Sequence, residues 1–254
     1  MRLYVAAAPD RLSDLSLPPA QTACAAYGIG TSSHLSVHAF SARLPGGLMM
    51  LSNENAPSVE NPDRLCREII GECIRRRYTG AVLDFIPSPA ADQIALIRRL
   101  DTLLQRQNLT LYVPEYYGMC VRYGTVLICT ALSGGTLRRR LTEAAASFAP
   151  RPIALDCQRL AMDFLIPSPN GEGVPLLTEQ LRQLMQGRSI FFSGDLCARY
   201  FTYRTASSAH FVLFDDGETL RRKVQLGAEV GAAAAFFMLP EVADLTGELF
   251  PSYG

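Results

Sequence analysis

The chain has 254 residues, of which 48% are hydrophobic and 19% charged, so a sizeable core is available and a disordered protein is excluded. Basic and acidic residues number 24 each, and no basic stripe with interleaved aromatic residues appears, so nucleic acid is not an expected partner. Because a single (β/α)8 barrel needs about 250 residues, we expect one domain over residues 1–254.

Short apolar runs alternate with amphipathic helices, a pattern typical of α/β folds with parallel sheets. The predicted strands span residues 2–8, 34–41, 47–52, 79–86, 109–114, 125–130, 152–156, 162–166, 188–193, 210–215 and 232–239. The predicted helices span residues 62–77, 90–106, 136–147, 176–186 and 217–229. The pattern predicts a single α/β domain, a (β/α)8 TIM-type barrel with an extra hairpin before the last helix and strand.

The strand candidates outnumber the eight of a barrel, so some must lie outside it. The segments 47–52 and 198–215 are the candidates for this external position. Two assignments of the sixth and seventh barrel strands stay open, either 125–130 with 152–156, or 162–166 with 188–193.

The N-terminus opens directly on a strand-like run, without the apolar segment and cleavage site of a signal peptide. No apolar run approaches the 18 or so residues of a membrane-spanning helix. The seven cysteines are scattered, and the three histidines do not cluster near cysteine pairs, which argues against disulfides and a zinc site. We therefore expect a cytoplasmic protein with no metal, no cofactor and no membrane partner; the sequence predicts no oligomeric state.

The segment from Tyr78 to Ile86 reads Tyr-Thr-Gly-Ala-Val-Leu-Asp-Phe-Ile, an apolar run that ends in an acid. A buried parallel strand delivers a carboxylate to the rim of an α/β barrel in this way. The segment resembles the fourth strand of glycoside hydrolase family 18, whose pattern ends Asp-x-Asp-x-Glu. Asp84 matches the middle acid, whereas the proton-donating Glu falls on Ile86 and the leading Asp on Thr79 or its neighbour.

The last third of the chain resembles the spore-cortex and peptidoglycan branch of that family. It carries an aromatic Phe-x-Tyr ending at Tyr203, a His followed by an apolar run into Asp215, and a helix with Lys223. In the closing strand, Met238 or Phe237 stands where the family usually has a Trp that floors the sugar subsite, and this chain has no Trp. The resemblance covers most of residues 34–245 and implies that Tyr203, Asp215 and Met238 lie at the substrate cleft.

Family 18 enzymes use the N-acetyl group of the substrate as the nucleophile and still need a Glu to donate a proton. Ile86 cannot donate one, and losing such an acid typically removes about 10²–10⁴-fold of rate. The resemblance therefore implies a degenerate barrel that binds a GlcNAc-containing glycan, of peptidoglycan or chitin type, with little or no hydrolase activity. Asp84 would hold the acetamido group; its plainer interpretation is a rim acid that caps the following helix or bonds a neighbouring backbone N–H.

The alternative is an active glycoside hydrolase with a relocated acid. Glu115 follows the predicted fifth strand, which neighbours the fourth, and is the best surrogate proton donor to work with Asp84. Tyr116 and Tyr117 could stack on or hydrogen-bond a sugar, although a surface Glu beside two packing aromatic residues explains the same segment. Asp163 and Asp156 are further rim candidates, depending on the strand assignment.

Three features have plain structural interpretations as well. Asp215-Asp216-Gly217 most simply forms a turn and N-cap before the next helix, and His210 is expected to be a structural histidine. Ser133-Gly134-Gly135-Thr136 opens a helix and could cradle an anion, or it is a tight turn. An unrelated barrel enzyme that acts on a small phosphorylated substrate through this loop is the third hypothesis.

Overall fold

A computed structural model describes residues 1–11, 17–41, 43–54, 56, 58–88, 90–167 and 171–250. Its central feature is a ring of eight parallel strands, which closes because the first strand pairs with both the last and the second. In ring order the strands are β1 (Arg2–Ala7), β2 (Thr22–Ile29), β4 (Leu48–Ser52), β5 (Gly80–Asp84), β6 (Thr110–Pro114), β7 (Thr125–Cys129), β8 (Ile153–Asp156) and β14 (Ala234–Met238). The predicted barrel is confirmed, and 125–130 with 152–156 is the correct assignment of its sixth and seventh strands.

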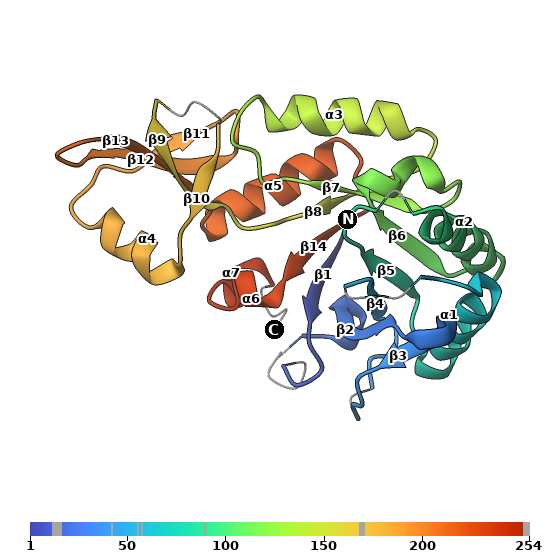
Figure 1. Cartoon of the computed structure of the whole chain (residues 1–254). Coiled ribbons are helices and arrows are strands. Elements are labelled where there is room, and N and C mark those ends of the chain that lie inside the picture. Colours follow the sequence, from blue (N-terminus) through green and yellow to red (C-terminus); the bar gives the residue numbers. More distant parts are fainter. Residues whose placement is uncertain are drawn as a thin grey trace.

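Helices cover the outside of the ring (Figure 1). The long ones are amphipathic and turn their apolar faces to the strands; α2, for example, buries Leu96, Ile97, Leu100 and Leu104. The α-helices outside the inserted segment are α1 (Pro62–Arg76), α2 (Ala91–Arg106), α3 (Leu137–Phe148), α5 (Gly217–Glu229), α6 (Leu239–Val242) and α7 (Thr246–Leu249). Short 3-10 turns are η2 (Pro19–Gln21), η3 (Thr31–Ser33) and η4 (Glu115–Cys120).

Two expectations near the N-terminus were wrong. The segment 47–52 is the third barrel strand and not an external hairpin, while the second strand, β2, was not predicted at all. From the candidate 34–41 only β3 (Leu35–Val37) forms, and it pairs antiparallel to β2 outside the ring. β2 escaped prediction because it is rich in alanine, which carries little of the β-branched or aromatic character of a strand.

The packing of the barrel interior explains why β2 contains alanines. Three rings, those of Tyr4, Tyr112 and Phe236, fill its centre, with centroids 4.9–6.2 Å apart. Several other residues of the interior cluster are small, which leaves room for the three rings; they are Ala6, Ala23, Ala154 and Ala234.

One close approach between barrel strands depends on a glycine. A Cβ placed on Gly80, the first residue of β5, would overlap the backbone of Thr110, the first residue of β6. Glycine therefore sets how closely these two strands pair at their amino ends.

A five-stranded antiparallel sheet is inserted between β8 and α5, and it extends to the left of the barrel in Figure 1. It comprises β9 (Ala161–Ile166), β10 (Gly173–Pro175), β11 (Phe191–Ser193), β12 (Ala198–Arg204) and β13 (Ala209–Phe214). Leu181 of α4 (Thr178–Met185) packs on one face of it, against Phe201, Val212 and Phe214. The predicted hairpin is present as β12 and β13, but three further strands make the insertion larger than expected.

In the part of the chain that the structure describes, no helix combines the length and the apolar character needed to cross a bilayer.

Candidate functional site

The carboxyl ends of the barrel strands form a mouth that contains two acids. Val82 of β5 and Ala154 of β8 belong to the interior cluster. Because side chains alternate along a strand, Asp84 and Asp156, each two residues further on, face the same interior at its upper rim. Met238, two residues beyond Phe236 on β14, packs against the same interior cluster.

Asp84 is the exposed acid of this pair. Its carboxylate makes no hydrogen bond or ion pair with any residue that the structure describes. Desolvation at the mouth raises the pKa of Asp84, and the nearby charge of Glu54 adds to the effect. The following helix, α2, has no side-chain cap at Ala90, so Asp84 does not serve as its N-cap.

Ile86 lies two residues beyond Asp84, where the motif resemblance would place a Glu. Asn53 holds its backbone on both sides, since the Ile86 N–H donates to Asn53 Oδ1 (2.7 Å) and Asn53 Nδ2 donates to the Ile86 carbonyl (3.1 Å). The Ile86 side chain is nevertheless 60% exposed. Counting two residues back from Asp84 places the leading acid at Val82, buried inside the barrel, and not at Thr79 as expected.

Asn53 was missed by sequence reasoning, although a signal was present. It directly follows the apolar run of β4, one residue beyond Ser52, which pairs in register with Asp84. Treating 47–52 as an external hairpin removed Asn53 from consideration.

Glu115 and its two tyrosines lie on η4, at the end of β6. The Glu115 carboxylate is ion-paired with Arg140 of α3. Tyr117 is buried, and its hydroxyl donates to the Ile86 carbonyl (3.0 Å) and accepts from the Ser88 N–H (2.9 Å). Tyr116 is 55% exposed and meets Tyr117 edge to face, so Tyr117 fixes the rim loop while Tyr116 is open to solvent.

Asp163 and Tyr203 lie together on the inserted sheet. Asp163 accepts from the Tyr203 hydroxyl (2.7 Å) and from His210 Nδ1 (3.1 Å), and the Tyr203 ring stacks on His210 with centroids 4.4 Å apart. Desolvation and the bond to Asp163 raise the pKa of Tyr203 to about 12. The three side chains therefore tie β9, β12 and β13 together.

Ser208 extends this network into a Ser–His–Asp sequence of hydrogen bonds, since its Oγ lies 2.8 Å from His210 Nε2. The same Oγ also bonds Thr205 Oγ1 at 2.7 Å, and the Ser208 N–H donates to Thr205 Oγ1. A hydrolase triad needs a free hydroxyl and backbone donors for an oxyanion. Both the hydroxyl and the backbone N–H of Ser208 are hydrogen-bonded to Thr205 within the hairpin turn. The network therefore stabilises the hairpin and does not form a catalytic triad.

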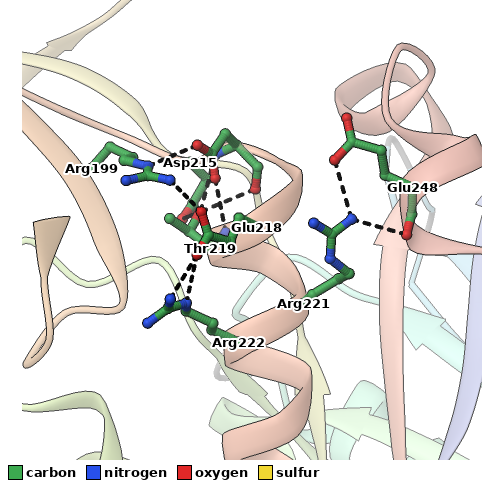
Figure 2. A network of polar contacts seen from close by, with 8 residues as sticks. Arg199, Asp215, Glu218, Thr219, Arg221, Arg222 and Glu248 are labelled. Atoms are coloured by element: carbon green, nitrogen blue, oxygen red, sulfur yellow. Dashed lines mark hydrogen bonds and ion pairs between the residues drawn. The ribbon is translucent and has the colours of Figure 1, made fainter. Parts of the chain in front are cut away.

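Asp215 lies at the base of the inserted sheet and is enclosed. It accepts from Lys223 Nζ (2.7 Å), Thr219 Oγ1 (2.8 Å) and the Leu160 N–H (2.9 Å). The adjacent Asp216 is the N-cap of α5, as the turn interpretation predicted. Figure 2 shows the ion pairs around this base, including Arg199 with Glu218, Arg222 with Glu218, and Arg221 with Glu248.

The loop of the phosphate hypothesis, Ser133–Thr136, precedes α3. The first helical N–H, that of Leu137, donates to the Asp195 carbonyl at 2.7 Å. This donor therefore already has a partner, and the loop contacts the turn between β11 and β12. Among the described residues, no group of three or more His, Cys, Asp or Glu side chains could hold a metal ion.

A cavity of about 740 Å³ lies beyond the carboxyl end of β1, beside Ala25 in the middle of β2. Ala8 and Pro9, which directly follow β1, line the cavity, and this places it on the mouth side of the barrel. Its lining also includes Asp10, His38 and Phe40. Substrate sites of such barrels lie at this pole.

These features define the class of the protein, which is a (β/α)8 barrel with an antiparallel sheet inserted between its seventh and eighth strands. No protein-family model and no curated protein sequence matches the chain. The resemblance to family 18 therefore rests on the short motifs and on the fold.

Solved structures identify the fold more closely. The spore cortex-lytic enzyme SleL from Bacillus megaterium matches with a TM-score of 0.61 and 16% identity, over 98% of this chain and 74% of that one. A chitinase from Chromobacterium violaceum matches with a TM-score of 0.61 and 14% identity, over 98% and 100% of the two chains. The family 18 chitinase from Cycas revoluta, solved with (GlcNAc)3, gives a TM-score of 0.60 and 15% identity over 97% of both chains. The chain thus has a barrel fold like that of family 18 glycoside hydrolases, as the sequence motifs predicted.

Proposed function

We propose that the protein binds a GlcNAc-containing glycan at the barrel mouth and hydrolyses it slowly or not at all. One observation carries the proposal. At the end of the fourth barrel strand the carboxylate of Asp84 has no hydrogen-bonding or ionic partner among the described residues, while two residues later the rim presents Ile86. This strand end thus keeps a group that can accept a hydrogen bond from an acetamido N–H, and it has no acid at position 86 to protonate a leaving oxygen.

The surroundings of these two residues support binding. Asn53 and Tyr117 hold the backbone of Ile86, so the rim next to Asp84 is preorganised and a ligand does not have to order it. The exposed Ile86 side chain offers apolar surface to the face of a sugar ring. Among the structural relatives, the Cycas revoluta chitinase was solved with (GlcNAc)3 in place, which makes GlcNAc oligomers the first ligands to test.

The test is calorimetric titration of GlcNAc oligomers and of soluble peptidoglycan fragments, run beside an assay of reducing-end release. We expect binding by the wild-type protein, a loss of about tenfold or more in Asp84→Ala, and no turnover above background. Glu143→Gln, an acid-to-amide change in an exposed pair with Arg139, is the matched control that should bind normally. Absence of binding to both glycan classes would disprove the proposal.

An active hydrolase that uses Glu115 with Asp84 is the second candidate. The ion pair with Arg140 weighs against it, because the guanidinium occupies the carboxylate that would have to reach the leaving oxygen. Turnover by the wild type that disappears in Glu115→Gln would establish this candidate instead.

A further inference from the structure

The carboxyl group of Asp156 lies in the same mouth as Asp84, three strands further round the ring. It ends β8 and is paired in register with Cys129 on one side and Phe236 on the other. The side chain is largely covered by protein, unlike that of Asp84. One oxygen, Oδ2, accepts from Gln158 Nε2 at 2.7 Å, and the other oxygen has no donor among the described residues.

The groups that face Asp156 favour its neutral form. Burial is the main cause that raises its pKa, to about 6, and the charges of Glu241 from α6 and Asp84 from β5 act in the same direction. The hydrogen bond from Gln158 opposes them only partly. On β7, burial also raises the pKa of the neighbouring Cys129 thiol, so that side chain brings no charge.

Nearby cations are engaged elsewhere. The guanidinium of Arg159 bonds Asp244 (2.6 Å) and the Glu241 carbonyl (2.9 Å), and the Arg159 N–H donates to Glu241. Lys223 is enclosed in its pair with Asp215. Neither cation bonds the Asp156 carboxylate.

We propose that Asp156 enters glycan binding as a neutral carboxyl group, donating its proton to a ligand oxygen while Asp84 accepts a hydrogen bond from the ligand. This inference rests on the proposed function and deepens it. An acetamido group carries one N–H donor and one carbonyl acceptor. A mouth with one accepting carboxylate and one donating carboxyl group is complementary to such a group, and it selects N-acetylated over deacetylated sugars. The selection holds only while Asp156 keeps its proton.

The test is titration of a GlcNAc tetramer into the whole protein over a pH series from about 5 to about 8. We expect the wild-type affinity to fall by about tenfold or more across the series, because the donor becomes a carboxylate that repels the ligand carbonyl. In Asp156→Asn the side-chain amide donates at every pH, so the affinity should stay nearly constant and exceed the wild-type value at the alkaline end. Asp156→Ala should bind weakly throughout, and the control Glu143→Gln should keep the wild-type profile.

A glucosamine tetramer is the matched probe of the ligand. It carries ammonium groups where the GlcNAc tetramer carries acetamido groups, so its affinity should rise as Asp156 ionises over the acidic part of the series, in which the amines keep their protons. A fall with pH for both sugars over that part of the series would contradict the assignment of an acetamido-specific donor.

The remaining outcomes distinguish the role of Asp156 from the proposed glycan binding. Wild-type binding of the GlcNAc tetramer that does not vary with pH, or a wild-type profile retained in Asp156→Asn, would overturn the role of Asp156 and leave glycan binding intact. No binding at any pH would overturn the proposed function itself and the role of Asp156 with it. Carboxyl-carbon NMR of the free protein measures the pKa of Asp156 without a ligand. A pKa in the range of ordinary aspartates would also refute the inference.

Discussion

Lys223 Nζ lies 2.7 Å from Asp215 Oδ2, and both side chains are completely enclosed. Asp215 directly follows β13, the last strand of the inserted sheet, and its carboxylate also accepts from the N–H of Leu160, just before the first strand of that sheet. The chain enters the inserted sheet at Leu160 and leaves it at Asp215, so both connections to the barrel meet at the Asp215 carboxylate. Lys223 of α5 neutralises the charge of that carboxylate.

Replacing Lys223 with Met should destabilise the protein by about 3–5 kcal/mol, because it leaves the buried Asp215 without a counter-charge. The free energy of unfolding in urea measures the loss. Arg222→Met, one residue earlier in an exposed pair with Glu218, should cost less than about 1 kcal/mol. If the Lys223 variant were no less stable than the Arg222 variant, the pair would not hold the insertion in place.

Replacing Ile86 with Glu should create hydrolase activity. The backbone there is already held by Asn53 and Tyr117, so a carboxyl group would project from a fixed rim next to Asp84. Reducing-end release from GlcNAc oligomers should rise by about 10²–10⁴-fold over the wild type. Ile86→Gln, equal in size but unable to donate a proton as an acid, should stay at background; equal activity of the two variants would rule out proton donation from this position.

Replacing Asp156 with Asn should make the protein more stable above about pH 6. The native pKa of about 6 exceeds the ordinary 3.8, so the folded wild type binds more protons than the unfolded chain between these values. Wild-type stability then falls as pH rises through this window, by about 3 kcal/mol at most, whereas the variant has no proton to lose there. Urea unfolding at a series of pH values tests this.

The control for this pH series is Asp63→Asn, which removes an exposed carboxylate paired with Arg99. Its difference from the wild type should stay small and show no step near pH 6. A difference between wild type and Asp156→Asn that shrinks with rising pH would contradict the sign derived above.

Replacing Tyr117 with Phe should lower the free energy of unfolding by about 1–3 kcal/mol, because the Ile86 carbonyl and the Ser88 N–H lose a shared partner. Tyr116→Phe is the adjacent control, exposed at the surface, and should change stability by about 0.5 kcal/mol or less. Thermal and urea unfolding of both variants give the comparison. Equal effects would mean that the Tyr117 hydroxyl does not fix the rim.

The sequence predicted the barrel because most of its strands are short apolar runs that alternate with amphipathic helices. The prediction failed at β2, because two of its alanines face a barrel interior that is filled by the rings of Tyr4 and Phe236. This packing requirement depends on the tertiary structure and leaves no signal in the local sequence pattern. The same failure hid Asn53, since its importance depends on β4 belonging to the ring.

The sequence predicted the location of a site residue when that residue stands at the end of a strand. It did not predict which residues are engaged by side chains of distant helices. Asp84 could be placed at the rim from its strand alone, and the structure puts it there. The engagement of Glu115 by Arg140 depends on the packing of α3, and the enclosure of Asp215 depends on Lys223, nearly two helix turns into α5. Asp156 was only one of several candidates until the seventh strand was assigned.

Gly80, at the amino end of β5, contributes to the geometry of the site, although the acid Asp84 lies at the other end of the strand. Gly80 and Asp84 share one strand, about 13 Å apart at the usual rise per residue. Because the amino end of β5 rests directly against the backbone of β6, any side chain introduced at position 80 would push the two strands apart or slide one past the other. The height of Asp84 relative to η4 would then change, so a residue that no ligand can reach governs the alignment of the rim.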